Sequence, residues 1–390
     1  MTKHRATIAL SAAALAVAVL GQTAVGHAAA KVVRVALFAE NSARVNNIQA
    51  SRTPKAGRLL ALNAKGQFPP SVIPAAPTSS ARAGGGAYTR TIVVHPDPDA
   101  TKAGSALVRA LAGISGNSAS NPYLVKIEPG VFDLVTASLT MKPYVDIEGS
   151  GEGVTTITSA DASGAGTLVA TSNSELRNLT VKNNGTGQQS VAIFAQTASP
   201  RITHVTASAS GGSENYGLHI SNGSPVLTNV SASASGGATA IALANLGGAT
   251  SASNSSFSAS DSTGGLVAAV LTASGGAMKL QSSTLTASGG SIAMGFRAYN
   301  SSQMLTNVTI SASGTGESYG INSGWKTQTP SVQVHQSRVS GQTNSVYAVS
   351  GFVRLGASQL SGPVGTLNAG TLACAASYDS SFSPLGPDCN

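Results

Sequence analysis

The chain has 390 residues, of which only 10% are charged, and its formal net charge is +8. A typical globular domain has about a quarter of its residues charged, so this composition argues against a protein built from amphipathic helices, whose outer faces need Lys and Glu. The abundant Gly, Ala, Ser and Thr favour flat, repetitive β structure, and two cysteines are too few for a cysteine-rich metal site.

Residues 1–30 read as a signal peptide. A basic start at Lys3 and Arg5 precedes an apolar run from Ala6 to Leu20, and small residues before residue 30 offer a cleavage site. The apolar run is too short to cross a bilayer comfortably. We therefore expect a secreted protein, extracellular or at the cell surface, whose mature form has no membrane span.

Residues 31–90 form a basic N-terminal arm followed by a Pro- and Gly-rich linker. Glu40 is the one acid between residues 31 and 65, against seven basic residues: Lys31, Arg34, Arg44, Arg52, Lys55, Arg58 and Lys65. Segments that bind nucleic acids usually interleave such residues with aromatic ones, and this arm does not. We expect a solvated arm and no nucleic-acid partner.

Residues 91–170 are interpreted as an N-terminal cap and the first coils of a solenoid. One apolar stripe runs from Ser105 to Ile114 and predicts a helix. Short strands should follow at Tyr123–Ile127 and Tyr144–Glu148. A helix that leads into strands can cover the open end of a β-helix, where apolar core and unpaired backbone would otherwise be exposed.

Residues 171–362 contain a repeat of apolar and small residues in strand-like alternation. Its copies begin 21 to 29 residues apart, at Leu176, Ile202, Leu227, Ala252, Leu280, Leu305, Val334 and Leu355, a spacing that suits one turn of a β-solenoid. The third position of each copy should form a column at the spacing of strands, about 4.8 Å: Asn178, His204, Asn229, Asn254, Ser282, Asn307, Gln336 and Ala357. We interpret this column as structural and His204 as a replacement for asparagine.

Residues 363–390 form a Ser-, Pro- and Gly-rich tail that contains both cysteines, Cys374 and Cys389. In an exported chain we expect them to form a disulfide. A loop of this length gains on the order of 3 kcal/mol from such a bond. The pair is therefore interpreted as a structural disulfide that holds the tail in place.

The segments Val125–Phe132, Met141–Gly153 and Thr155–Thr158 resemble the pectin lyase-like superfamily, in particular pectinesterase-like proteins of the secreted bacterial type. The resemblance implies an all-β fold, a right-handed parallel β-helix, here with an N-terminal capping helix. Pectinesterases use two carboxylates beside an arginine and glutamines, because one carboxylate attacks the ester while the other transfers protons. Gln189 lies in the one segment that is weakly similar to the glutamine motif of pectinesterases. The aspartate motif of that family has no counterpart in this sequence.

The acids do not form the clusters that catalysis on this fold needs. Between residues 171 and 360 they are Glu175, Glu214, Asp261 and Glu317, each in a different repeat. Calcium requires six or more oxygen ligands, and hydrolysis of glycosides requires paired carboxylates. We expect no metal or other cofactor and a non-catalytic protein, with a pectinesterase-like enzyme as the alternative.

One group of residues predicts a sugar-binding platform. Arg297 and Tyr299 follow the second strand of one repeat, and Asn322, Trp325 and Lys326 follow the same strand in the next repeat. Aromatic faces flanked by hydrogen-bond donors suit sugar rings. We therefore expect a polysaccharide or surface glycan as partner, although Trp325 could instead pack a loop against the solenoid.

Two further surfaces extend this prediction. His219 lies at a similar phase about three coils away, roughly 14 Å by strand spacing, and could serve an extended ligand. Rows of outward hydroxyls, such as Thr206, Ser208 and Ser210, should also form a regular grid. An ice-binding or purely structural solenoid is the second alternative.

Overall fold

The computed structural model describes residues 44–45, 48–51, 59–60, 87–261, 264–325 and 327–390. The chain divides into two compact units, residues 1–80 and 81–390. In the first unit, β1 (Arg44–Val45) pairs antiparallel with β2 (Ile48–Ser51), which pairs parallel with β3 (Leu59–Leu60). The predicted signal peptide, most of the predicted basic arm and Lys326 lie outside the described residues.

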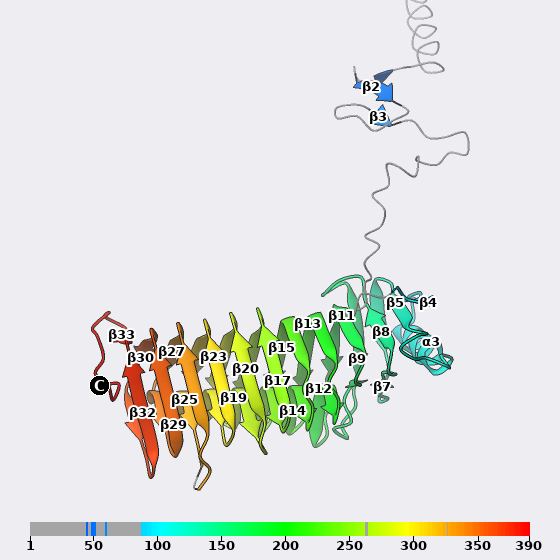
Figure 1. The fold of residues 1–390 in the computed structure, drawn as a ribbon. Helices are drawn as coiled ribbons and strands as arrows, with labels where there is room; N and C mark the ends of the chain where they lie inside the picture. Colours follow the sequence, from blue (N-terminus) through cyan, green and yellow to red (C-terminus); the bar gives the residue numbers. More distant parts are fainter. Residues whose placement is uncertain (1–43, 46–47, 52–58, 61–86, 262–263, 326) are drawn as a thin grey trace, which may run out of the picture. The chain divides into compact units, whose positions relative to one another are not determined.

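A capping helix lies at one end of the solenoid that the second unit forms (Figure 1). This helix, α3, spans Ala100–Ala112 and buries Leu107 and Leu111. It begins five residues before the predicted start at Ser105, because Asp99 accepts hydrogen bonds from the backbone N–H groups of Thr101 and Lys102 and thereby caps the first turn. A Cβ on Gly104 would lie 2.0 Å from the carbonyl oxygen of Asp133, so glycine is needed where the helix meets the first coils.

Each coil contributes up to three strands, which stack in parallel register on those of the next coil. The first ladder contains β4 (Arg90–Val94), β5 (Tyr123–Ile127), β8 (Val145–Glu148), β11 (Glu175–Asn183), β13 (Arg201–Ser210), β15 (Val226–Ser235), β17 (Ala249–Ser253), β20 (Ala277–Gln281), β23 (Ser302–Thr306), β26 (Ser331–His335), β29 (Gly351–Gly356) and β32 (Gly370–Ala375).

The second ladder contains β6 (Gly130–Asp133) and β9 (Thr155–Ser159), passes through the C-terminal halves of β11, β13 and β15, and continues with β18 (Ser256–Asp261), β21 (Thr284–Gly289), β24 (Thr309–Ser313), β27 (Arg338–Gly341), β30 (Gln359–Ser361) and β33 (Tyr378–Asp379).

The third ladder is a separate sheet of β7 (Leu139–Thr140), β10 (Leu168–Ala170), β12 (Gln189–Gln196), β14 (Glu214–Ser221), β16 (Thr239–Leu246), β19 (Leu266–Ala273), β22 (Ile292–Ala298), β25 (Glu317–Ser323), β28 (Asn344–Ala348) and β31 (Val364–Thr366). The three ladders together form a right-handed parallel β-helix of about nine turns, which confirms the predicted fold class. No helix among the described residues is both long enough and apolar enough to cross a membrane.

The predicted repeat phase is confirmed by the register of the first ladder. Its inward row pairs the apolar residues that begin each copy, from Leu176 and Ile202 through to Leu355. The row continues to Cys374, which pairs with Leu355. Residues 363–390 therefore include three more strands of the solenoid, and the disulfide between Cys374 and Cys389 fastens the end of the chain to this last coil.

The predicted column lies at the bend between the first and second ladders. All eight of its residues have a positive φ, between 49° and 57°, and asparagine tolerates this left-handed conformation better than most residues. Asn229 Nδ2 lies 3.0 Å from His204 Nε2, and Asn307 Nδ2 donates to Ser282 Oγ over 3.1 Å. His204 thus occupies a bend position like that of the asparagines.

A row of buried serines inside the bend was not predicted. The residue that follows the column is a buried serine in five coils: Ser255, Ser283, Ser337, Ser358 and Ser377. Each Oγ accepts a backbone N–H from the preceding coil, as Ser337 does from Val308 at 3.1 Å. Each also donates to a carbonyl two residues earlier in its own chain. These serines therefore satisfy backbone groups that the tight bend would leave unpaired.

Arg177 anchors a buried charge network on the first coils. Its guanidinium donates to Glu148 at 2.7 Å, to Glu175 at 2.9 Å and to the hydroxyl of Tyr88 at 3.1 Å. Tyr88 in turn donates to Asp146 at 2.7 Å, and burial raises the pKa of that carboxyl. The network ties the start of the second unit to β8 and β11.

Candidate functional site

The outer face of the third ladder carries a second hydrophobic layer. Six of its residues are almost completely buried and form the outer cluster: Ile241, Ala244, Ala268, Leu271, Met294 and Tyr319. In β16 and β19 both faces are therefore apolar, and the two strands read as continuous apolar runs rather than alternating ones. Such runs are typical of strands covered on both faces, and this signal in the sequence would have indicated the layer.

Arg297 and Asn322 lie at the C-terminal side of the outer cluster, in register on β22 and β25. Each is only 4% exposed, and Arg297 Nη1 donates to Asn322 Oδ1. The guanidinium carbon lies 4.5 Å from the ring centre of Tyr299 and 5.5 Å from that of Trp325. Burial lowers the pKa of Arg297. The structure thus brings four of the five residues of the predicted platform together, with Lys326 outside the described residues.

Trp325 is the exposed member of this group, with 50% of its surface accessible. Tyr319 and Tyr347, on β25 and β28, stack with ring centres 5.2 Å apart and pack with Tyr299 on the outer cluster. Burial, together with a hydrogen bond to Glu317, raises the pKa of Tyr319 to about 12. We call this group the aromatic patch: Arg297, Tyr299, Tyr319, Asn322, Trp325 and Tyr347. The two added tyrosines were missed because their outward position depends on strand register.

Gln189 and His219 lie at the opposite side of the outer cluster, beside Glu214. Gln189 Nε2 donates to Glu214 Oε2 at 2.8 Å, and the hydroxyl of Tyr216 donates to the same oxygen at 3.1 Å. His219 stacks on Tyr216 at 4.8 Å. Burial lowers the pKa of His219, although the charge of Glu214 acts in the opposite direction.

The register places His219 in one outward row with Arg297, three strands away, through Ala244 and Leu271. At about 4.8 Å per strand, this agrees with the separation expected from the sequence. The two positions lie on one outer face, with the apolar residues Ala244 and Leu271 between them.

The carboxylates on this face are not arranged as a catalytic pair. Glu214 and Glu317 share one row, but they are four strands apart, which corresponds to roughly 19 Å. An esterase needs its two carboxylates around a single ester. The side-chain amide of Gln189 moreover donates a hydrogen bond to Glu214. Among the described residues, no group of three or more His, Cys, Asp or Glu side chains could hold a metal ion.

The predicted hydroxyl rows lie on a different face, along the second ladder. Thr206, Ser231, Ser256, Thr284 and Thr309 pair in register from β13 to β24. The next residue in this row is Arg338, so the hydroxyl row ends in a charge. In the other direction the row continues from Thr206 through Thr180 to Thr156, and Thr206 donates to Glu152 at 2.7 Å.

No protein-family model and no curated protein sequence matches the chain. Among solved structures it is similar to two mannuronan C-5 epimerase A-modules from Azotobacter vinelandii. The AlgE6 module is 16% identical, with a TM-score of 0.38 over 71% of this chain and 75% of that one. The AlgE4 module is 14% identical, with a TM-score of 0.40 over 71% of this chain and 90% of that one.

A third similar structure is the pectin methylesterase PemA from Erwinia chrysanthemi. It is 12% identical, with a TM-score of 0.33 over 78% of this chain and 92% of that one. All three are right-handed parallel β-helix proteins, the class of fold described above.

Proposed function

We propose that the protein is a non-catalytic, extracellular β-helix that contacts polysaccharide or surface glycan through the aromatic patch. The main observation behind this proposal is the contact between the ring of Trp325 and the guanidinium of Arg297. The indole ring is half exposed, while the guanidinium beside it is buried and bonded to Asn322. A rigid aromatic face backed by a fixed cation offers a sugar ring an apolar platform with polar groups at its edge.

The apolar outer cluster supports the same proposal, because its face joins the aromatic patch to Tyr216 and His219. An extended glycan lying across the strands would contact both ends. The disulfide between Cys374 and Cys389 fits an oxidising location outside the cytoplasm. Stacking on one ring contributes about 1 kcal/mol, so a single patch implies weak affinity unless several copies act together.

The test uses the fluorescence of Trp325, the one tryptophan of the chain. Its emission should shift when a polysaccharide that binds the patch is added, and Trp325→Ala should lose retention on a glycan array of clustered protein while keeping its circular dichroism. Phe352→Ala is the matched control, because Phe352 is an exposed aromatic residue with its own arginine, Arg354, 5.7 Å away on the first ladder. Equal retention of Trp325→Ala and the native protein would contradict the proposal.

The esterase alternative has one observation in its favour, namely that Gln189 does lie on the outer face and contacts a carboxylate, Glu214. Release of methanol from esterified pectin separates the two functions. Turnover that is abolished by Gln189→Ala would replace the binding role with an enzymatic one.

A further inference from the structure

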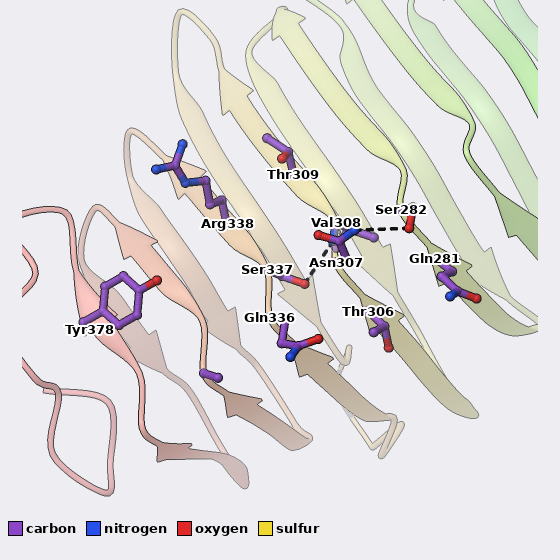
Figure 2. A pocket seen from close by; sticks show the side chains of 11 residues that line it. Gln281, Ser282, Thr306, Asn307, Val308, Thr309, Gln336, Ser337, Arg338 and Tyr378 are labelled. Atoms are coloured by element: carbon purple, nitrogen blue, oxygen red, sulfur yellow. Dashed lines mark hydrogen bonds between the residues drawn. The ribbon is translucent and has the colours of Figure 1, made fainter.

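A groove runs along the outside of the bend between the first and second ladders, near the C-terminal end of the solenoid (Figure 2). It has a volume of about 700 Å³. Its floor is the column of left-handed residues, here Ser282, Asn307, Gln336 and Ala357. The groove lies on ladders other than the one that carries the aromatic patch.

The floor offers hydrogen-bonding groups once per coil. Asn307 and Gln336 are exposed, and Asn307 is steadied by its bond to Ser282. The left-handed bend fixes the backbone beneath them, so neighbouring amides follow each other at the strand spacing of about 4.8 Å. A surface that repeats in this way suits a polymer lying along the solenoid axis better than a small molecule.

One wall of the groove carries its charge. Thr309, Arg338, Gln359 and Tyr378 form one row in register from β24 to β33. Arg338 is the one charged side chain among the described residues that line the groove. Asp379, beside Tyr378, has its carboxylate held by Ser381 and the backbone N–H of Ser383. Asp379 is not among the described residues that line the groove, and neither is any other acid. Arg338 therefore gives the lining a positive charge, which favours an anionic ligand.

The end of the groove is aromatic. Tyr378 lines it and stacks on Phe382 with ring centres 5.3 Å apart. Phe382 is 68% exposed, more than any other large apolar side chain described. The disulfide between Cys374 and Cys389 encloses both residues in one loop, so the pair has a fixed place on the last coil.

We propose that this groove binds an acidic linear polysaccharide along the solenoid axis. Arg338 pairs with the acid groups of the polymer, Asn307 and Gln336 bond its hydroxyls, and the Tyr378–Phe382 stack carries a sugar ring. This site is additional to the aromatic patch, and it explains why an exposed phenylalanine stands at the end of a polar groove.

Retention of the full mature chain on immobilised polymers tests the proposal. Polygalacturonate supplies carboxylates, dextran sulfate supplies sulfates, unmodified dextran is the neutral polymer, and double-stranded DNA is a polyanion without exposed sugar faces. The protein should be retained by one or both acidic polysaccharides and not by dextran. Arg338→Gln should weaken binding about tenfold, as expected for loss of one charge-assisted hydrogen bond, and Phe382→Ala about fivefold.

Two controls separate this site from general charge and from the aromatic patch. Arg201→Gln removes an exposed arginine on β13, far along the ladder from the groove, and should leave retention unchanged. Phe352→Ala removes an exposed aromatic residue that belongs neither to the groove nor to the aromatic patch and should also leave retention unchanged. The glycan-array test of Trp325→Ala reports on the aromatic patch by itself, so failure of the patch and failure of the groove can be told apart. Equal retention on DNA, equal losses for Arg201→Gln and Arg338→Gln, or no loss for Arg338→Gln would each overturn the proposal.

Discussion

The ring of Trp325 and the guanidinium of Arg297 lie 5.5 Å apart, and the arginine is the buried partner. We predict that Arg297→Met loosens the indole, because the cation that supports it is worth about 0.5–2 kcal/mol. Tryptophan emission should move to longer wavelength and acrylamide quenching should increase. Arg354→Met, which removes the cation beside Phe352, should change neither. Unchanged quenching in Arg297→Met would show that other contacts hold Trp325.

Arg177→Met should destabilise the N-terminal coils strongly. The substitution removes the guanidinium to which both Glu148 and Glu175 are bonded. Lys126 still pairs with Glu148 at 2.7 Å, so the loss falls mainly on Glu175, and breaking a buried ion pair costs about 3–5 kcal/mol. Thermal unfolding followed by circular dichroism measures the effect. Arg201→Met is the control, since Arg201 is exposed although it pairs in register with Glu175, and its midpoint should match that of the native protein. Similar midpoints for both variants would mean that the network adds little.

Ser337→Ala tests the row of buried serines inside the bend. The variant leaves the N–H of Val308, which bonds to Ser337 Oγ at 3.1 Å, without a partner in the core. An unsatisfied buried donor costs about 1–3 kcal/mol. Ser313→Ala, on an exposed position of β24, removes the same hydroxyl from the surface and should have almost no effect on thermal stability. A neutral Ser337→Ala would indicate that another group can replace the serine.

Stability should fall as the pH is lowered through the range in which histidine titrates. Burial lowers the pKa of His219 in the folded protein, whereas unfolded histidine titrates near 6.5. Below that value the unfolded state binds the additional proton, so this contribution to stability is complete above pH 6.5 and declines toward the folded pKa. His219→Gln should flatten the pH dependence of the unfolding temperature, and His335→Gln, at an exposed position, should not. A native-like slope in His219→Gln would assign the effect to other groups.

Reduction of the disulfide should expose the end of the chain rather than melt the solenoid. Cys374 lies in β32 and Cys389 one residue from the C-terminus, and coils hold their neighbours by local contacts. Limited proteolysis with and without reductant, followed by mass spectrometry, should remove residues near Phe382 only after reduction. Digestion of the entire core would show that the disulfide stabilises far more than the last coil.

Several features of the fold were predictable because they depend on local chemistry. The repeat phase follows from inward residues such as Leu176 and Ile202, and the two cysteines allow a single pairing. The start of α3 was placed too late, since an apolar stripe marks the buried face of a helix and not its cap, which here is Asp99. The buried serines, such as Ser337, cannot be told from surface serines in the sequence. The backbone N–H that each Oγ accepts belongs to the preceding coil, so it is known only once the coils are stacked.

The coil, the column and the disulfide could be predicted from the order of the amino acids, because each depends on spacing along a short stretch of chain. The surfaces that the coils create follow only from the way in which the coils stack. Arg297 and Asn322 become bonded neighbours through parallel register, although they are 25 residues apart. Thr309, Arg338 and Tyr378 likewise form one wall from three different coils. The physical reason is that stacking sets side by side residues that the chain separates by a whole turn, and burial of an outward side chain depends on the coils on either side of it.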